Sequence, residues 1–368
     1  MKIPFLSFNE MNASIKEELK NGFERFIDDG WYILGNRLKE FEQSFADYSH
    51  TSFCSGVGNG LDALIISLKA VGIGSGDEVI VPSNTYIATW LAVSYVGATP
   101  IPVEPRLETY NINPDLIANK ITSKTKAILP VHLYGQACEM EVIMAIAKKH
   151  GLFVIEDNAQ AQGATYNHQK TGSFGHINAT SFYPGKNLGA FGDAGAITTN
   201  DEQLYRFANV YRNYGSEKKY YNEIKGINSR LDEMQSLFLS IKLKRLDDWN
   251  SERIKIANRY NELLQGVENI ILPSLAQHAT SVFHLYVIRT EKREELQNYL
   301  TQNNIGTLIH YPVPPHLQLA YSELNYKKGD FPLAEKIAST CLSLPVYPGL
   351  TDDQLVYISE TIKKFFHA

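Results

Sequence analysis

One lysine of the chain lies in a sequence setting that favours covalent chemistry. Lys186 belongs to the segment 181–189 (SFYPGKNLG), where its neighbours are small or aromatic, and further glycines follow closely. Glycine at this density indicates close backbone approach or positive φ angles. A lysine shielded from water has a lowered pKa and is suited to forming a Schiff base with a carbonyl compound. An exposed loop lysine is the plain alternative. A phosphate-binding P-loop is excluded because Thr180 and Asn187 stand where its fingerprint needs Gly and Ser or Thr.

An aspartate follows an apolar segment that is expected to be a buried strand. Asp157 comes just after the run 153–155 (FVI). In an open α/β sheet, ligands bind beyond the carboxyl ends of the strands, so this carboxylate is expected at a ligand-binding edge. A cap or turn residue is the simpler interpretation of a single aspartate. The functional interpretation is a carboxylate that faces the cationic nitrogen of a ring.

A glycine-rich turn offers a place for a phosphate. The segment 55–64 (SGVGNGLDAL) leads from this turn into a predicted helix, whose first backbone N–H groups are free to bind an anion. The segment is a weak match to a dinucleotide-binding fingerprint. That fingerprint needs a ribose-binding acidic residue at the end of the next strand, and this chain does not have an acid at that position. A single phosphate therefore fits better than a pyrophosphate, and Ser181 is a candidate for a further hydrogen bond to it.

An aromatic residue completes the set of side chains with possible chemistry. Tyr86 begins a predicted helix just after a central strand; it is either a core residue or a side chain that stacks on a planar ligand. A Schiff-base lysine, a ring-facing acid, a single-phosphate turn and a stacking aromatic together match pyridoxal phosphate. The ten histidines show no metal-ligating spacing, so no metal site is expected.

These residues must be positioned by a sheet, and the chain pattern predicts one. Between residues 79 and 155, short apolar runs alternate with helical segments, which is typical of a mostly parallel sheet covered by helices. Strands are expected at 79–81, 100–103, 127–129, 153–155 and 282–288. Helices are expected at 15–27, 37–48, 86–96, 114–120, 139–150, 292–302 and 355–366.

A change in amino-acid composition near residue 226 suggests two domains. No glycine or proline occurs from 227 to 265, which predicts a long helix, broken once, that leaves the large domain. Residues 1–250 are therefore predicted to form the large cofactor-binding domain. Residues 251–368 are predicted to form a smaller C-terminal α+β domain.

The composition excludes several classes of function. The chain has 368 residues and a formal net charge of −5, with no Lys/Arg-rich run, so binding to nucleic acid or to a membrane surface is not expected. Its three cysteines are far apart, which favours a reducing compartment over a disulfide framework. The uncharged stretch 79–103 contains prolines and is interpreted as strand, helix and strand rather than a membrane span. A cytoplasmic protein is expected.

Almost the whole chain resembles the DegT/StrS-type nucleotide-sugar aminotransferases. The most specific segments are 57–64 (VGNGLDAL), 183–189 (YPGKNLG) and 225–233 (KGINSRLDE). They look most like the subgroup that aminates C-3 of dTDP-3-keto-6-deoxyhexoses. The resemblance implies an α/β, type I pyridoxal-phosphate fold like that of aspartate aminotransferase. Such a fold has a large domain with a mostly parallel seven-stranded sheet and a smaller C-terminal α+β domain.

The resemblance also implies cofactor roles. Lys186 would hold the cofactor as a Schiff base and later shuttle a proton, and Asp157 would keep the ring nitrogen protonated. Gln160 would contact the ring hydroxyl, and Tyr86 would stack on the ring. The phosphate would be bound by Asn59, Gly60 and Ser181, and by Asn228 of a neighbouring subunit. This last role implies a homodimer with shared active sites.

Substrate contacts are implied for a further set of side chains. Many relatives have His where this chain has Tyr183; the 3-amino-sugar subgroup shares the tyrosine, which we expect to line the sugar pocket. That subgroup usually has His at position 221, so a sugar contact by Tyr221 departs from the pattern. Arg230 is a candidate for the carboxylate of the amino donor, with a structural salt bridge as the equal alternative. The remaining candidates are Lys219, Tyr311 and His316.

The expected activity is a two-step transamination. L-glutamate would supply the amino group, and C-3 of a dTDP-linked keto-6-deoxyhexose would receive it. The product would be a dTDP-3-amino-3,6-dideoxyhexose for surface polysaccharide, such as O-antigen, or for glycosides. The alternatives are amination at C-4 or of a UDP-linked sugar, and a non-catalytic regulatory protein on the same scaffold. A sugar dehydratase is disfavoured because that branch replaces the lysine with His.

Overall fold

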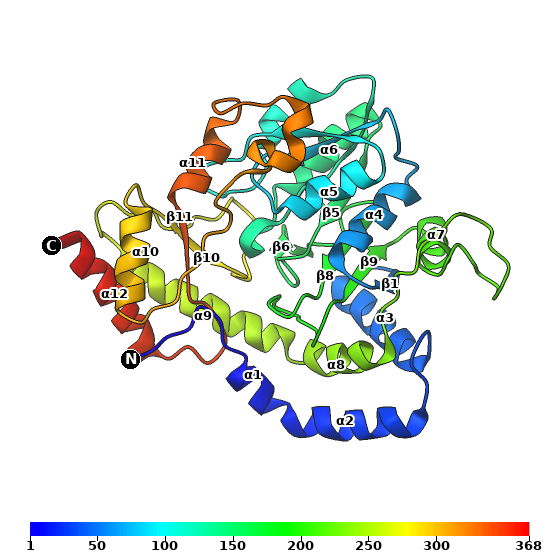
Figure 1. The fold of residues 1–368 in the computed structure, drawn as a ribbon, viewed down its shortest axis with the longest axis horizontal. Coiled ribbons are helices and arrows are strands. Elements are labelled where there is room, and N and C mark those ends of the chain that lie inside the picture. The colour runs from blue at the N-terminus through cyan, green and yellow to red at the C-terminus, as the bar shows by residue number, and fades with distance from the viewer. Residues whose placement is uncertain (368) are drawn as a thin grey trace.

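The structure, a computed structural model, describes residues 1–367 and has a seven-stranded sheet at its centre (Figure 1). The strands are β1 (Phe53–Val57), β2 (Glu78–Pro82), β3 (Thr99–Val103), β4 (Thr125–Ile128), β5 (Phe153–Asp157), β8 (Ile177–Ser181) and β9 (Gly195–Thr199). They lie in the order β1-β9-β8-β5-β4-β2-β3, and within this sheet β9 alone runs against the others. The predicted mostly parallel α/β sheet is therefore confirmed.

Helices cover both faces of the sheet. They are α3 (Asn36–Ser49), α4 (Gly60–Ala70), α5 (Ile87–Tyr95), α6 (Met140–His150), α7 (Glu202–Arg212) and α8 (Glu233–Leu243). Successive residues of β2 reach different cores: Val79 and Val81 pack with α4 and α5, whereas Ile80 packs with α6. The strand is apolar on both faces for this reason, as expected for a covered parallel sheet. No helix within residues 1–367 is both long and apolar enough to span a bilayer.

A second core lies in the C-terminal part of the chain. Its elements are α9 (Leu246–Leu264), β10 (Tyr286–Arg289), α10 (Arg293–Gln302), α11 (Pro332–Thr340), β11 (Cys341–Leu344) and α12 (Asp352–His367). Figure 1 shows α9 running from α8 toward α12. Ile3, from the N-terminus, packs in this second core and forms a bridge with Ile305. The predicted boundary at residue 250 falls inside α9, so the division into 1–250 and 251–368 stays a prediction.

Shorter elements complete the fold. They are α1 (Asn9–Ser14), α2 (Lys16–Asp29), β6 (Thr165–Tyr166), β7 (Gln169–Lys170), and the 3-10 turns η1 (Pro114–Leu116), η2 (Ala118–Lys120), η3 (Leu133–Gly135), η4 (Pro315–Leu317) and η5 (Leu319–Leu324). The helix predicted at 114–120 is thus two 3-10 turns, the first capped by the Asn113 side chain. The long predicted helix does break once, between α8 and α9.

Two kinds of strand differ from the prediction. The strand expected at 282–288 begins only at Tyr286, because Phe283 has a φ of 43° and leaves the extended conformation. The strands β1, β8 and β9 were not predicted. They are rich in Gly, Ser, Thr and Asn, so they lack the apolar run that marked the other strands.

Candidate active site

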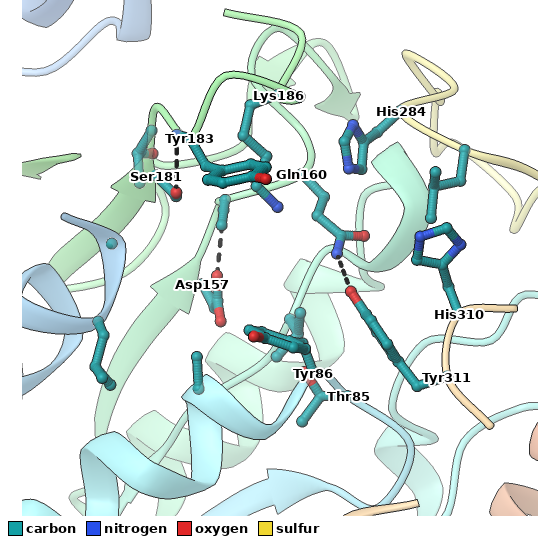
Figure 2. A pocket seen from close by; sticks show the side chains of 18 of the residues that line it. Thr85, Tyr86, Asp157, Gln160, Ser181, Tyr183, Lys186, His284, His310 and Tyr311 are labelled. Atoms are coloured by element: carbon teal, nitrogen blue, oxygen red, sulfur yellow. Dashed lines mark hydrogen bonds between the residues drawn. The ribbon is translucent and has the colours of Figure 1, made fainter. Parts of the chain in front are cut away.

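A cavity of about 980 Å³ collects most of the predicted site residues. Lining residues come from the sheet, from the first turns of α4 and α5, and from the C-terminal part of the chain. The predicted site residues among them are Asn59, Gly60, Tyr86, Asp157, Gln160, Ser181, Tyr183, Lys186 and Tyr311. Figure 2 shows several of these side chains pointing toward one shared space. The geometry therefore assembles one site from segments far apart in the sequence.

Lys186 is held by a tight loop between β8 and β9. The loop is closed by backbone hydrogen bonds from Phe182 N to Ala194 O and from Ala190 N to Phe182 O, each 2.8 Å long. Lys242 on α8 fixes it further by donating to Gly189 O at 2.7 Å. Burial lowers the pKa of the Lys186 amine to about 8, although the negative charge of Asp157 opposes the shift. A larger share of the amine is therefore neutral near pH 7 than in an exposed lysine.

Asp157 is the last residue of β5 and is almost fully buried. Its Oδ2 accepts a hydrogen bond from Thr89 Oγ1 at 2.9 Å, and its Oδ1 accepts one from Ala159 N at 3.2 Å. Burial raises the pKa of this carboxyl, while the two hydrogen bonds and the charge of Lys186 counteract the rise. The two hydrogen bonds thus fix the orientation of the carboxylate. Because its negative charge is only partly balanced by its surroundings, it is suited to face the cationic nitrogen of a ring.

The opposite end of the site is a helix N-terminus. Asn59 caps α4 by accepting from Asp62 N at 2.8 Å, and Gly60 is the first residue of the helix. A Cβ on Gly60 would lie 2.6 Å from the Cβ of Ser181, so only glycine allows β8 to approach the helix this closely. Backbone N–H groups and the Ser181 hydroxyl meet here at the positive end of the helix dipole. The arrangement is suited to one phosphate group.

Aromatic and amide side chains form the remaining walls. Tyr86 is the N-cap of α5 and is 53% exposed, so its ring belongs to the cavity and not to the core. Its ring centre lies 5.1 Å from that of Tyr311. Gln160 Nε2 donates to Tyr311 Oη at 3.1 Å, as Figure 2 shows, while its Oε1 accepts from Tyr134 N at 2.7 Å. Gln160 is therefore held in place before any ligand binds.

These residues fit pyridoxal phosphate. The glycine cradle beside Ser181 receives a phosphate, the exposed ring of Tyr86 offers a face for stacking, and Asp157 and Lys186 line the same cavity. When bound, the cofactor supplies an electron sink that stabilises negative charge on the carbon beside the amino nitrogen. The chain itself supplies a nucleophilic amine at Lys186 Nζ and a proton-holding carboxylate at Asp157.

The structure does not bring every predicted residue into this cavity. Asn228, Lys219 and Tyr221 are exposed and lie outside its lining. Arg230 also lies outside it; the guanidinium donates to Asn213 Oδ1 at 3.0 Å, so the predicted alternative of a salt bridge is replaced by a neutral partner. His316 is buried against Glu335, 3.1 Å away, instead of facing the cavity.

Some lining residues were missed by the sequence reasoning. His284, His310 and Arg253 line the cavity, and none of them was predicted as a site residue. Thr89, in the first turn of α5, was also missed; its hydroxyl donates a hydrogen bond to Asp157. The sequence offered one signal for Thr89: it lies three residues after Tyr86, a spacing that places both residues on the same side of a helix.

The chain matches a known family of enzymes. The profile of the DegT/DnrJ/EryC1/StrS aminotransferase family matches residues 13–363. A similar relative is the dTDP-3-amino-3,6-dideoxy-alpha-D-galactopyranose transaminase of Aneurinibacillus thermoaerophilus, 52% identical over 99% of both chains. Another, 41% identical over 99% of this chain and 98% of the relative, is the UDP-N-acetyl-3-dehydro-alpha-D-glucosamine 3-aminotransferase of Acidithiobacillus ferrooxidans.

A solved structure agrees with these relatives. The crystal structure of DesV from S. venezuelae, in complex with a ketimine intermediate, superposes with a TM-score of 0.98 at 45% identity and covers 100% of this chain and 99% of that chain. The type I pyridoxal-phosphate fold and the cofactor are thereby confirmed. The chain belongs to the DegT/DnrJ/EryC1/StrS aminotransferase family and is a pyridoxal-phosphate-dependent sugar aminotransferase.

Proposed function

We propose that this protein transfers the amino group of L-glutamate to C-3 of a dTDP-linked keto-6-deoxyhexose. The product would be a dTDP-3-amino-3,6-dideoxyhexose, used for surface polysaccharide or glycosides. One observation carries the reaction type: Lys186, with its lowered pKa, and Asp157 line a single cavity beside a one-phosphate cradle. The sugar and its C-3 position rest on the 52% identity to the dTDP-3-amino-sugar relative.

The residues of this chain have separate tasks in that reaction. Lys186 Nζ accepts the proton that leaves the α-carbon of the donor, and in the second half-reaction it delivers a proton to the sugar carbon. Asp157 keeps the ring nitrogen protonated, held at one oxygen by Thr89 and at the other by Ala159. Tyr183 lies beside Lys186 in Figure 2 and is 59% exposed, as a side chain that meets the sugar should be.

The absorbance spectrum of purified protein tests the reaction type. We expect a visible band that L-glutamate bleaches, and we expect a Lys186→Ala variant to lack that response. A protein that stays colourless after addition of the cofactor would contradict the proposal. It would favour a non-catalytic role on the same scaffold.

A second substrate class is favoured by a specific observation. The 41% identical relative is named for a UDP-linked 3-keto sugar, so UDP-linked 3-keto sugars are the second candidate substrate class. The protein should be loaded with L-glutamate and then offered dTDP- and UDP-linked sugars that carry the keto group at C-3 or at C-4. Restoration of the visible band by the dTDP-linked 3-keto sugar alone is the expected result. Faster restoration by a UDP-linked or 4-keto sugar would replace the proposed substrate.

Shared active sites in a homodimer are part of the same proposal. Asn228, Lys219 and Tyr221 are exposed on the segment between α7 and α8, away from the cavity of their own chain. If Asn228 completes a partner's phosphate site, mixing inactive Lys186→Ala and weakened Asn228→Ala subunits should restore activity, because each mixed dimer then has one intact site. Mixtures no more active than the separate variants would contradict the arrangement.

A further inference from the structure

A buried arginine in the cavity wall has no acidic partner among residues 1–367. Arg253 on α9 is only 2% exposed, yet it lines the same cavity as Lys186. One of its nitrogens, Nη1, donates to the backbone oxygen of Val346 at 2.6 Å, and its Nε has no hydrogen-bond partner within residues 1–367. Burial lowers the pKa of this guanidinium to about 10, and no carboxylate acts against the shift. Buried charges in proteins are normally paired, so this cation calls for an anion.

Another buried arginine of the chain shows what a structural role looks like. Arg212 on α7 is 5% exposed, and its Nη1 contacts both the carboxylate of Glu42 and the backbone oxygen of Gly56. Its charge is therefore balanced inside the protein. Both arginines leave Nε without a hydrogen-bond partner within residues 1–367. Arg253 differs from Arg212 because it has the backbone contact without the carboxylate. The missing partner of Arg253 is expected to enter through the cavity that its side chain lines.

The histidines beside Arg253 do not supply the negative charge. His284 and His310 also line the cavity, and burial together with the positive charge of Lys186 lowers the pKa of both rings. For His284 the charge of Arg253 adds to this effect. His284 Nδ1 lies 3.2 Å from Asn187 Oδ1, an acceptor, so this nitrogen carries the proton of a neutral ring. One neutral histidine is thus close enough to both Lys186 and Arg253 to be influenced by each.

We propose that Arg253 binds a carboxylate of the donor amino acid. This inference rests on the proposed transamination, in which the cavity receives first an amino acid and then a keto-sugar. The reacting amine of the donor must lie near Lys186, and Arg253 borders the same space. The planar guanidinium fork matches a carboxylate, while a keto-sugar ring is uncharged and cannot neutralise it.

Other anions of the reaction fit this position less well. The cofactor phosphate is accommodated at the N-terminus of α4, by Asn59, Gly60 and Ser181. A nucleotide diphosphate carries more charge than one arginine can balance, and the cavity lining also contains the apolar residues Leu6, Leu308 and Val346. Arg230, the candidate expected from the sequence, does not border this cavity.

The test separates the two half-reactions. Arg253→Met removes the charge while keeping a similar shape, and Arg253→Lys keeps the charge. Arg259→Met, at a half-buried arginine of the same helix that is paired with Asp352 and lies outside the cavity lining, is the control. The bleaching of the cofactor band is followed against L-glutamate concentration, and its return against keto-sugar concentration. Binding of glutarate, a dicarboxylate without an amino group, is measured by calorimetry on the cofactor-free protein.

We expect Arg253→Met to weaken both L-glutamate and glutarate binding about 10- to 100-fold, the range for losing a hydrogen bond to a charged group. The lysine variant should retain part of the affinity, and the keto-sugar half-reaction should change less than threefold. Unchanged glutarate binding would overturn the proposal. Equal losses in both half-reactions would mean a structural role, and a selective loss with the sugar would assign Arg253 to the diphosphate.

Failure of the proposed function is recognised separately. If the wild-type protein keeps its visible band with L-glutamate, that donor is wrong, whatever Arg253 does. Glutarate titration of wild type and Arg253→Met still decides whether this arginine binds a carboxylate. Other amino acids would then be tried as donors.

Discussion

Replacement of Lys186 by methionine should stabilise the cofactor-free protein at pH 7, and the gain should shrink at pH 10. Burial lowers the pKa of this amine from 10.5 to about 8. A group whose pKa is lowered on folding favours the folded state above its unfolded pKa, and this advantage is lost as the pH falls through its folded pKa. At pH 7 the amine is protonated in both states, so folding carries the full cost of burying the charge.

The size of the effect follows from the two pKa values. One pKa unit corresponds to about 1.4 kcal/mol, so the cost of the buried amine is about 3 kcal/mol at pH 7 and about 1 kcal/mol at pH 10. Lys186 is partly exposed to the open cavity, where water reduces the cost, and these values are therefore upper limits. The stability difference between Lys186→Met and wild type should fall by up to about 2 kcal/mol between pH 7 and pH 10.

Urea unfolding of the cofactor-free proteins measures this difference. Both proteins are unfolded at one fixed concentration between pH 7 and pH 10, because an assembly equilibrium would otherwise change the apparent stability. Lys39→Met, at an exposed position on α3, controls for exchanging a lysine for methionine. The reasoning is refuted if the difference between Lys186→Met and wild type is the same at every pH. It is also refuted if the Lys39 variant shows an equal change.

Three other substitutions test the surroundings of the site. Thr89→Val removes the hydroxyl that donates to Asp157, which should raise the pKa of that carboxyl. The acid limb of the pH–rate profile of the L-glutamate half-reaction should then move up by about 1 pH unit, whereas Thr89→Ser should leave it in place. Gly60→Ala should weaken cofactor binding about tenfold in fluorescence titrations, because its Cβ would meet Ser181; unchanged affinity would argue against the cradle. Glu233→Gln should cost about 2 kcal/mol in urea unfolding, because this buried carboxylate accepts the backbone N–H groups that begin α3; a loss confined to activity would contradict that role.

The centre of the sheet could be predicted from the sequence because its strands are apolar on both faces. The runs around Val79, Ile128 and Val154 stand out from their polar surroundings, and the structure places all three in strands. The strands next to the phosphate cradle could not be found in this way. β1 and β9 contain glycine and hydroxyl residues, since Gly56 must leave room for Leu231 and Gly195 must leave room for Asn59.

The cofactor end of the site was predictable for a related reason. Asp157 and Tyr86 lie at the ends of elements that the periodic pattern reveals, and the Lys186 loop is marked by its glycines. Arg253 was not predicted, although it lies four residues after Trp249 and three before Ile256, on the buried stripe of α9. Its importance comes from burial without an acidic partner among residues 1–367, which only the packed fold defines.

Burial acts on the two central ionisable groups in opposite directions, with a common result. It lowers the pKa of Lys186 and raises that of Asp157, so it moves both groups toward their neutral forms in the cofactor-free protein. The hydrogen bonds to Asp157 favour its charged form, and they do so whether or not a ligand is present. A cationic ring nitrogen beside Asp157 adds the missing positive charge. Cofactor binding should therefore complete the ionisation of this carboxyl, while the lowered pKa of Lys186 increases the share of its amine that is uncharged and nucleophilic.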